Sequence, residues 1–158
     1  MKVFLGLGSN MGERRDNLQR AIEAIDNLPC TFVEAVSGII ETEAEGKWNQ
    51  VSGEGPEKFL NCCVRIETTV SPERLLGMLK KIETDLGRLN GGIKRDDSGE
   101  RIYSDRPIDI DILLYGRRRI NTPALQIPHP RMQERDFVMI PLREIALGRK
   151  MMFNETKK

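Results

Sequence analysis

The sequence predicts an α+β fold in which helices pack on a mainly antiparallel sheet. Strand-like runs of apolar residues alternate along the chain with two stretches of clear helical periodicity. Each helical stretch follows a strand-like run, and the sequence has no internal repeat. The resulting order, β-α-β-β-α-β, is typical of a ferredoxin-like sandwich, a fold that hosts many functions and therefore selects none of them.

Length and composition predict a single domain over residues 1–158, with a frayed tail at residues 147–158. The chain has 158 residues, 39% of them hydrophobic and 31% charged, and a formal net charge of +1. Near-neutral charge does not favour nucleic-acid binding, and no apolar run approaches the ~18 residues of a membrane span. The N-terminal residues lack the features of a secretory signal. We therefore expect a cytoplasmic protein without nucleic-acid or membrane partners, and a monomer because no apolar helix face is left over.

The first elements are a strand, a glycine-rich turn and a helix. Residues 2–7 form an apolar run that ends in a turn at residues 6–12. The turn matches neither the Walker nor the dinucleotide-binding pattern, so a tight structural turn is its default interpretation. Apolar residues recur at helical spacing between residues 17 and 28, and Pro29 ends the pattern. This stretch predicts the first helix.

The middle of the chain predicts two strands, two loops and a helix. Residues 31–42 predict one long irregular strand and residues 59–68 another, with a loop at residues 43–58 between them. Ser71 as N-cap, proline at the first helical position and an apolar stripe that ends at Gly87 predict the second helix. The polar residues 88–103 predict a second loop, which could fold over a bound polyphosphate because it leads into the next strand.

The strand at residues 59–68 contains one polar residue and two adjacent cysteines of interest. Asn61 lies within the strand, and a solvent-facing and a ligand-facing position are both open for it. Cys62 and Cys63 point to opposite faces of a strand and lack the spacing of a zinc site. We therefore expect both cysteines to be reduced packing residues.

The most informative stretch is residues 108–112, where apolar and acidic residues alternate strictly. A period of two predicts a half-buried strand, with the isoleucines in the core and Asp109 and Asp111 projecting together from the other face, roughly 6.6 Å apart. Two carboxylates without a nearby His or Cys favour Mg²⁺, which leaves its other positions to water and substrate phosphates. Arg106 adds a bidentate donor suited to phosphate. A solvated edge strand with Arg106 paired to an aspartate is the alternative, and spacing alone leaves both open.

The last part of the chain contains the only histidine, His129. A lone histidine is more often structural than catalytic, but two flanking prolines hold this one in a defined position near Arg131 and Arg135. Residues 137–145 predict a short final helix.

Seven short motifs in this chain occur in the order found in one enzyme family. The most specific is Arg-x-x-Asp-x-Asp at residues 106–111, together with Pro-His-x-x-Met at 128–132 and Arg-x-Phe at 135–137. Over about residues 2–146 the chain resembles the 6-hydroxymethyl-7,8-dihydropterin pyrophosphokinases. The other motifs are at residues 8–10, 41–43, 59–61 and 87–88.

The resemblance implies transfer of the β,γ-pyrophosphoryl group of ATP to the hydroxymethyl oxygen of 6-hydroxymethyl-7,8-dihydropterin. The products are AMP and the pterin diphosphate, in a step of folate biosynthesis. It further implies that Asp109 and Asp111 hold two Mg²⁺ ions and that Arg106, His129 and Arg135 contact the ATP phosphates.

The resemblance also implies residues for each substrate. Phe59 and Phe137 match the aromatic residues that sandwich the pterin, and Asn61 matches the amide that pairs with its polar edge. Ile112 matches a position against the adenine. The remaining nucleotide-side residues are Glu83, Arg88 and Tyr103, and the remaining pterin-side residues are Gly8, Thr42 and Asp109.

Three stretches depart from the family pattern. Residues 43–45 are Glu-Ala-Glu where many members have proline and an apolar residue, and residues 103–105 replace the commoner Trp-Gly-Pro. The basic pair usual after Arg88 is absent, and Lys94, Arg95 and Arg101 are candidate replacements.

A noncatalytic ferredoxin-like module that senses a small ligand is the alternative function.

Overall fold

The computed structural model describes residues 1–44, 47–48, 57–87, 94–103 and 106–146, with the backbone alone at 47–48, 94–95 and 101–103. The helical elements are α1 (Arg14–Asp26), α2 (Pro72–Asp85), the 3-10 turn η1 (Met132–Glu134) and α3 (Asp136–Ile145). The strands are β1 (Lys2–Ser9), β2 (Thr31–Val36), β3 (Ile40–Thr42), β4 (Lys47–Trp48), β5 (Phe59–Thr68), β6 (Lys94–Arg95), β7 (Arg101–Tyr103), β8 (Asp109–Tyr115), β9 (Ile120–Asn121) and β10 (Gln126–Ile127).

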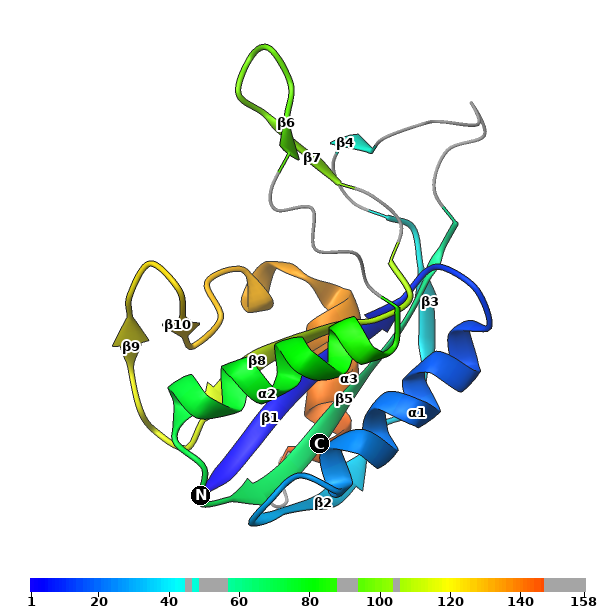
Figure 1. Cartoon of the computed structure of the whole chain (residues 1–158). Helices are drawn as coiled ribbons and strands as arrows, with labels where there is room; N and C mark the ends of the chain where they lie inside the picture. The colour runs from blue at the N-terminus through cyan, green and yellow to red at the C-terminus, as the bar shows by residue number, and fades with distance from the viewer. Residues whose placement is uncertain (45–46, 49–56, 88–93, 104–105, 147–158) are drawn as a thin grey trace.

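The main sheet has five strands in the order β2-β5-β1-β8, with β3 also paired to β5. All of these pairs are antiparallel. Helices α1 and α2 cover one face of the sheet, and α3 lies against the other (Figure 1). The α+β class is confirmed, and β1, α1, β2, β5, α2 and β8 follow the expected β-α-β-β-α-β order.

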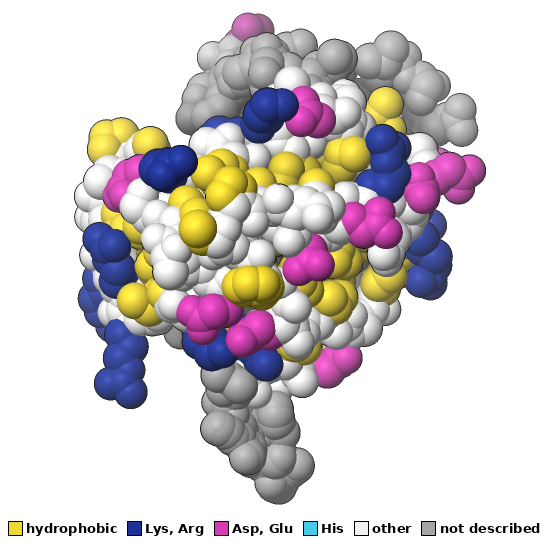
Figure 2. Space-filling view, turned by 60° about the horizontal axis from the view of Figure 1, so that its bottom comes forward, with side chains coloured by type: hydrophobic (Ala, Val, Ile, Leu, Met, Phe, Trp, Pro, Cys, Tyr) yellow, Lys and Arg dark blue, Asp and Glu magenta, His cyan; other side chains and the backbone are white. Residues whose placement is uncertain are grey.

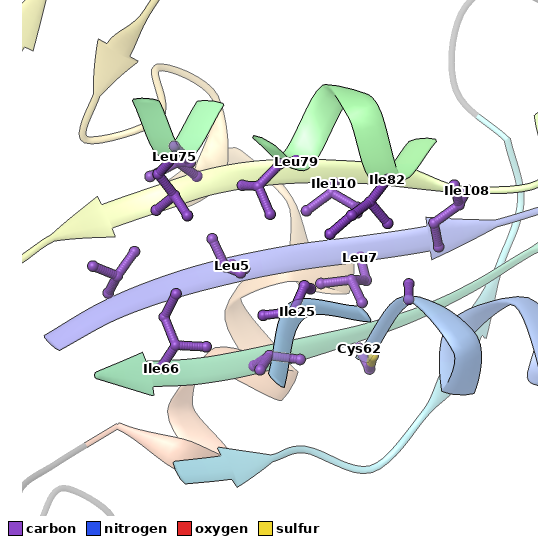
Figure 3. Packing of buried hydrophobic residues seen from close by; sticks show 14 of the residues in the cluster. Leu5, Leu7, Ile25, Cys62, Ile66, Leu75, Leu79, Ile82, Ile108 and Ile110 are labelled. Atoms are coloured by element: carbon purple, nitrogen blue, oxygen red, sulfur yellow. The ribbon is translucent and has the colours of Figure 1, made fainter. Parts of the chain in front are cut away.

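Two hydrophobic clusters, one on each face of the sheet, hold the layers together. The larger cluster joins β1, β5 and β8 to α1 and α2, and Leu5, Ile25 and Leu79 within it are at most 1% exposed (Figure 3). The smaller cluster joins the opposite face to η1 and α3. Burying apolar area on both faces of one sheet is the main source of stability in such a fold.

The adjacent cysteines of β5 pack as the alternation of the strand predicts. Cys62 belongs to the larger cluster and Cys63 to the smaller, and both are free thiols. Burial raises the pKa of each thiol to about 12, so both remain protonated. Their predicted role as reduced packing residues is confirmed.

The predicted helices are present, with small shifts at their ends. The Ser71 hydroxyl accepts the Arg74 N–H, Pro72 begins α2, and Gly87 follows the helix with a φ of +106°. The first helix begins at Arg14, three residues before the apolar pattern, because its first turn faces solvent. The final helix begins one residue early, at Asp136.

The strand predicted over residues 31–42 is wrong as a single element. It is divided into β2 and β3, and between them the Ser37 N–H donates to the Cys63 carbonyl while the Ser37 hydroxyl accepts the Cys63 N–H. These two hydrogen bonds continue the connection to β5 across the break, and both β2 and β3 pair with β5.

The two stretches predicted as loops contain short strands that pair with one another. β4 comes from the first stretch and β6 and β7 from the second, and they form a three-stranded sheet in the order β4-β7-β6. This sheet lies beyond the end of the main sheet (Figure 1). Elements of two or three residues are too short to show a period of two, which is why the pattern missed them. The predicted tail at 147–158 lies outside the described residues.

No helix among the described residues is long and apolar enough to cross a membrane. On the face shown in Figure 2, acidic, basic and apolar side chains are interspersed. That distribution agrees with the formal net charge of +1.

Candidate active site

A cleft of about 1090 Å³ opens beside β8, between α2 and the segment that leads into α3. Its walls come from β1, β5, β8, α2 and residues 123–138. The cleft brings together every predicted site residue whose side chain is described, although these residues are scattered over most of the chain. They are Gly8, Thr42, Phe59, Asn61, Glu83, Arg106, Asp109, Asp111, Ile112, His129, Arg135 and Phe137.

Two predicted residues cannot be placed in the cleft. Arg88 lies outside the described residues, as does the stretch that follows it up to residue 93. Tyr103 is the last residue of β7, where the backbone alone is described.

The two aspartates project from one face of β8, as the alternation predicts. Ile110 and Ile112 are buried in the larger cluster, while the side chains of Asp109 and Asp111 are 28% and 42% exposed. Gly8 and Gly6 of β1 lie directly opposite them in the sheet. Because side chains opposite one another share a face, β1 places no side chain of its own beside either carboxylate; the Leu113 side chain packs on Gly6, and Asn61 and Phe59 pack on Gly8.

Both sequence-based interpretations of the acidic strand contain part of the answer. β8 is an edge of the main sheet, and an Arg106 guanidinium nitrogen lies 3.5 Å from an Asp109 carboxylate oxygen. These are features of the solvated-edge interpretation. The carboxylates nevertheless face a cleft whose cationic side chains suit the phosphates that the metal interpretation expects beside Mg²⁺.

A β-bulge in β8 connects the aspartates to His129. The register with β1 shifts so that Ile112 opposes Leu5 and Leu114 opposes Phe4, which leaves Leu113 as the extra residue. The Leu113 carbonyl accepts the backbone N–H of His129 at 3.0 Å. The bulge thus fixes the histidine beside the strand that carries the carboxylates.

The environment of His129 defines which ring nitrogen carries the proton. Its Nδ1 accepts the Arg131 N–H at 3.3 Å, so the proton of the neutral ring is on Nε2, which lies 4.0 Å from an Asp111 oxygen. Burial is the main cause that lowers the histidine pKa, and Arg135 lowers it further, against the opposing effect of Asp109. The ring is therefore a neutral donor at neutral pH.

An arginine lies over each of the two predicted pterin-stacking rings. The Arg106 guanidinium carbon is 5.9 Å from the centre of the Phe59 ring, and that of Arg135 is 5.4 Å from the centre of the Phe137 ring. These are cation–π distances. Each pair places an aromatic surface beside a cationic group, so the predicted stacking and phosphate positions adjoin.

Asn61 is buried, so the solvent-facing alternative for it is wrong. Its amide nitrogen donates to the Thr42 hydroxyl at 2.8 Å, which orients the carboxamide. A methyl group at Gly8 would lie 3.0 Å from the Asn61 amide oxygen and 3.3 Å from the Phe59 ring. Glycine is therefore required at position 8 for these two side chains to lie over β1.

Glu83 holds the edge of β8. Its carboxylate accepts the Ile110 N–H at 2.7 Å, and the side chain is 7% exposed. An unpaired N–H on an edge strand is costly when buried, and this contact satisfies it. Ile112 is 4% exposed, so most of its side chain is packed in the core.

Several cleft residues were not identified from the sequence. Lys80, Lys81 and Arg131 line the cleft, and Lys81 also pairs with Asp85 at 2.8 Å. The lysines belong to the polar side of α2, and only the packing of α2 beside β8 reveals that this side faces a cleft. No local pattern distinguishes them from ordinary solvated lysines.

Residues 4–147 match the model of the family described as 7,8-dihydro-6-hydroxymethylpterin-pyrophosphokinase (HPPK). The chain belongs to the HPPK family. It is 38% identical over 148 residues to the 2-amino-4-hydroxy-6-hydroxymethyldihydropteridine pyrophosphokinase of Porphyromonas gingivalis, covering 91% of this chain and 90% of that protein. It is also 38% identical over 144 residues to the protein of that name from Bacillus subtilis, covering 91% and 77%.

The HPPK match also extends to longer proteins. The chain is 37% identical over 141 residues to a folate synthesis bifunctional protein of Arabidopsis thaliana, covering 89% of this chain and 26% of that protein. Membership of the HPPK family does not favour the alternative of a noncatalytic sensing module.

Mg²⁺ fits the side chains of this HPPK cleft. Asp109 and Asp111 supply hard oxygen ligands from one strand face, and both line the cleft. A cation between the carboxylates would also relieve the repulsion of two like charges on one face.

Proposed function

We propose that this cleft catalyses the HPPK reaction with the residues described above. The oxygen of the pterin hydroxymethyl group attacks the β-phosphorus of ATP while the bond from that phosphorus to the oxygen bridging the α-phosphorus breaks. AMP leaves, and the hydroxyl proton is released. The reaction belongs to folate biosynthesis. The observation that supports it is one cleft in which paired carboxylates, cationic donors and a pair of aromatic rings adjoin.

Asp109 and Asp111 hold two Mg²⁺ ions, which neutralise triphosphate charge when bound. The chain's own contribution is positioning, as in phosphoryl transfer generally. The carboxylates fix where the triphosphate lies relative to the pterin hydroxyl, and Asp109 also faces the pterin. No covalent nucleophile is needed.

Arg106, His129 and Arg135 hold the phosphates. The arginines provide fixed positive charge, and neutral His129 donates a hydrogen bond from Nε2. Arg88 and Tyr103 complete the nucleotide side. Ile112 lies against the adenine, and Glu83 supports that side by holding β8.

The pterin lies between Phe59 and Phe137, with Asn61 paired to its polar edge. Stacking between two rings orients a flat heterocycle, and a carboxamide offers both a donor and an acceptor to its edge. Thr42 orients the Asn61 amide, and the absence of a side chain at Gly8 allows Asn61 and Phe59 to pack there.

The remaining expectations belong to the same proposal. Residues 1–158 form one catalytic domain that acts as a monomer in the cytoplasm, and its substrates are ATP and the pterin without a nucleic-acid partner. Gel filtration at assay concentrations tests the monomer, since a dimer would elute at about twice the mass.

Calorimetry and a product assay test the function together. Binding of a non-hydrolysable ATP analogue should depend on Mg²⁺, and ATP with the hydroxymethyl pterin should give AMP and pterin diphosphate. ATP alone, or ATP with a pterin that lacks the hydroxyl, is the control and should give no AMP. Nucleotide binding of equal affinity with and without Mg²⁺, or no AMP from ATP and the hydroxymethyl pterin, would overturn the proposal.

A further inference from the structure

The turn after β1 contains a fully buried asparagine that the reaction scheme does not use. Asn10 has 0% exposure and follows the last residue of β1. Its backbone N–H donates to the Arg106 carbonyl at 3.2 Å, and its side-chain oxygen accepts the Arg106 N–H at 2.8 Å. Its side-chain nitrogen donates to the Glu57 carbonyl at 3.3 Å. A single residue therefore binds two other segments of the chain.

The two segments that Asn10 joins lead into opposite sides of the cleft. Arg106 lies three residues before Asp109 and carries the guanidinium proposed for the phosphates. Glu57 lies two residues before Phe59, which is proposed to stack on the pterin. Both contacts lie beyond the pairing of β1, which ends at Gly8 opposite Asp109 and at Ser9 opposite Leu60, while β3 pairs with β5 as far as Phe59. The sheet ladders therefore reach neither Glu57 nor Arg106.

We infer that Asn10 is a positioning residue that sets the phosphate-binding side of the cleft relative to the pterin-binding side. The inference rests on the proposed function of Arg106 and Phe59. Because its side chain is fully buried, Asn10 acts through these residues and does not touch a substrate.

The chemistry of the side chain explains why asparagine suits this position. A carboxamide carries an acceptor and a donor on one planar group, so it satisfies a backbone N–H on one side and a carbonyl on the other. Aspartate retains the acceptor but has no N–H for Glu57, and alanine satisfies neither group. Pyrophosphoryl transfer requires the two substrates at near-attack distance, and an error of about 1 Å can cost about 100-fold in rate.

A second buried asparagine, in α1, contacts the same turn and supplies a matched control. Asn17 is 8% exposed, and its amide donates to the Met11 carbonyl at 2.9 Å and to the Ser9 hydroxyl at 3.4 Å. These bonds hold the turn itself, without contact to the segments at Glu57 and Arg106. Asn17→Ala therefore reports the cost of loosening the turn alone.

The decisive experiment is a double-mutant cycle of Asn10→Ala with Arg106→Ala, in which calorimetry measures the affinity for a non-hydrolysable ATP analogue with Mg²⁺. We expect Asn10→Ala to weaken binding about 10-fold in the wild-type background and less than about 2-fold when Arg106 is already alanine. Asn17→Ala combined with Arg106→Ala should give additive losses. Additive losses for Asn10 as well would overturn the inference.

Asn10→Asp separates the two contacts and serves if Asn10→Ala does not fold. It keeps the acceptor for the Arg106 N–H and places a carboxylate oxygen against the Glu57 carbonyl. We expect pterin affinity to fall about 10-fold and analogue affinity to change less than about 3-fold. An equal loss of both affinities would contradict the positioning role.

If the wild-type protein forms no AMP, the proposed function fails. If the wild-type protein is active and the losses in the double-mutant cycle are additive, only the role of Asn10 is refuted.

Discussion

The two ends of β1 show how similar charges serve different purposes. At the start of the strand, Lys2 lies 2.5 Å from Glu34 and 3.2 Å from Glu67, and the terminal amine also pairs with Glu67. These groups neutralise one another at the surface. At the other end, the carboxylates of Asp109 and Asp111 line a cleft together with cationic side chains.

The difference comes from the residues of β1 itself. Lys2 opposes Glu67 directly in the sheet, so the charge on one strand is met by the charge on its neighbour. Gly6 and Gly8 oppose the aspartates, so β1 offers no side chain to pair with them. The two carboxylates instead line the cleft, where Arg106 lies 3.5 Å from Asp109 and His129 lies 4.0 Å from Asp111.

The largest expected effect is at Asp109, beside the end of β1 that lies at the cleft. Asp109→Asn should lower kcat by about 10³-fold, equivalent to about 4 kcal/mol of lost transition-state stabilisation, because it removes a charge that we propose holds metal and triphosphate. Thermal unfolding should change little, since this side chain is 28% exposed. Steady-state AMP formation measures the effect.

Glu34→Gln is the control for that variant, because it removes a carboxylate at the opposite end of the sheet. It should leave kcat unchanged. Near-normal turnover in Asp109→Asn would show that the carboxylates at the cleft end contribute no more to catalysis than Glu34 does.

The next effect distinguishes the aromatic rings of the two regions. Phe59→Ala should weaken pterin binding about 10- to 100-fold, or about 1.5–3 kcal/mol, because the stacking surface is lost. Phe32→Ala is the matched control, since Phe32 is 67% exposed on β2, outside the cleft. Calorimetric titration with the pterin measures both variants, and equal affinities would refute the stacking role of Phe59.

A smaller effect tests Gly8, on which Asn61 and Phe59 pack. Gly8→Ala places a methyl group 3.0 Å from the Asn61 oxygen, so the amide must shift. We expect pterin affinity to fall about 10-fold, with a cost of about 1–2 kcal/mol, while affinity for the ATP analogue with Mg²⁺ changes less than about 2-fold. The two titrations on one variant provide the control, and unaltered pterin affinity would show that pterin binding does not depend on the position of Asn61 over Gly8.

The smallest effect concerns pH at the start of β1. The hydrogen bond from Lys2 is the main cause that lowers the Glu34 pKa below its ordinary 4.5. A lowered carboxyl pKa stabilises the fold above the ordinary value, and this contribution is lost as pH falls through the folded-state value.

The stability difference between wild type and Glu34→Gln should therefore be small but present at about pH 7 and absent at about pH 2. Urea unfolding at the two pH values measures it. A difference that grows toward low pH would show that Glu34 stabilises the fold through another interaction.

Much of the fold and the site could be predicted from local patterns. Strict alternation at residues 108–112 identified the faces of β8, and the cap, proline and glycine of α2 identified its ends. Elements of two or three residues were missed. The break between β2 and β3 was also missed, because it depends on hydrogen bonds between Ser37 and Cys63 across two strands.

By itself, the sequence determined which residues alternate, which stretches are helical and which motifs place the chain in its family. Each of these patterns lies within a short run of consecutive residues. The tertiary structure alone decided that Asn10 holds Arg106, 96 positions away, that it also holds Glu57, 47 positions away, and that Glu83 holds Ile110, 27 positions away. The physical reason is that such contacts depend on strand register and helix packing, which bring distant backbone groups within hydrogen-bond reach and have no local signature.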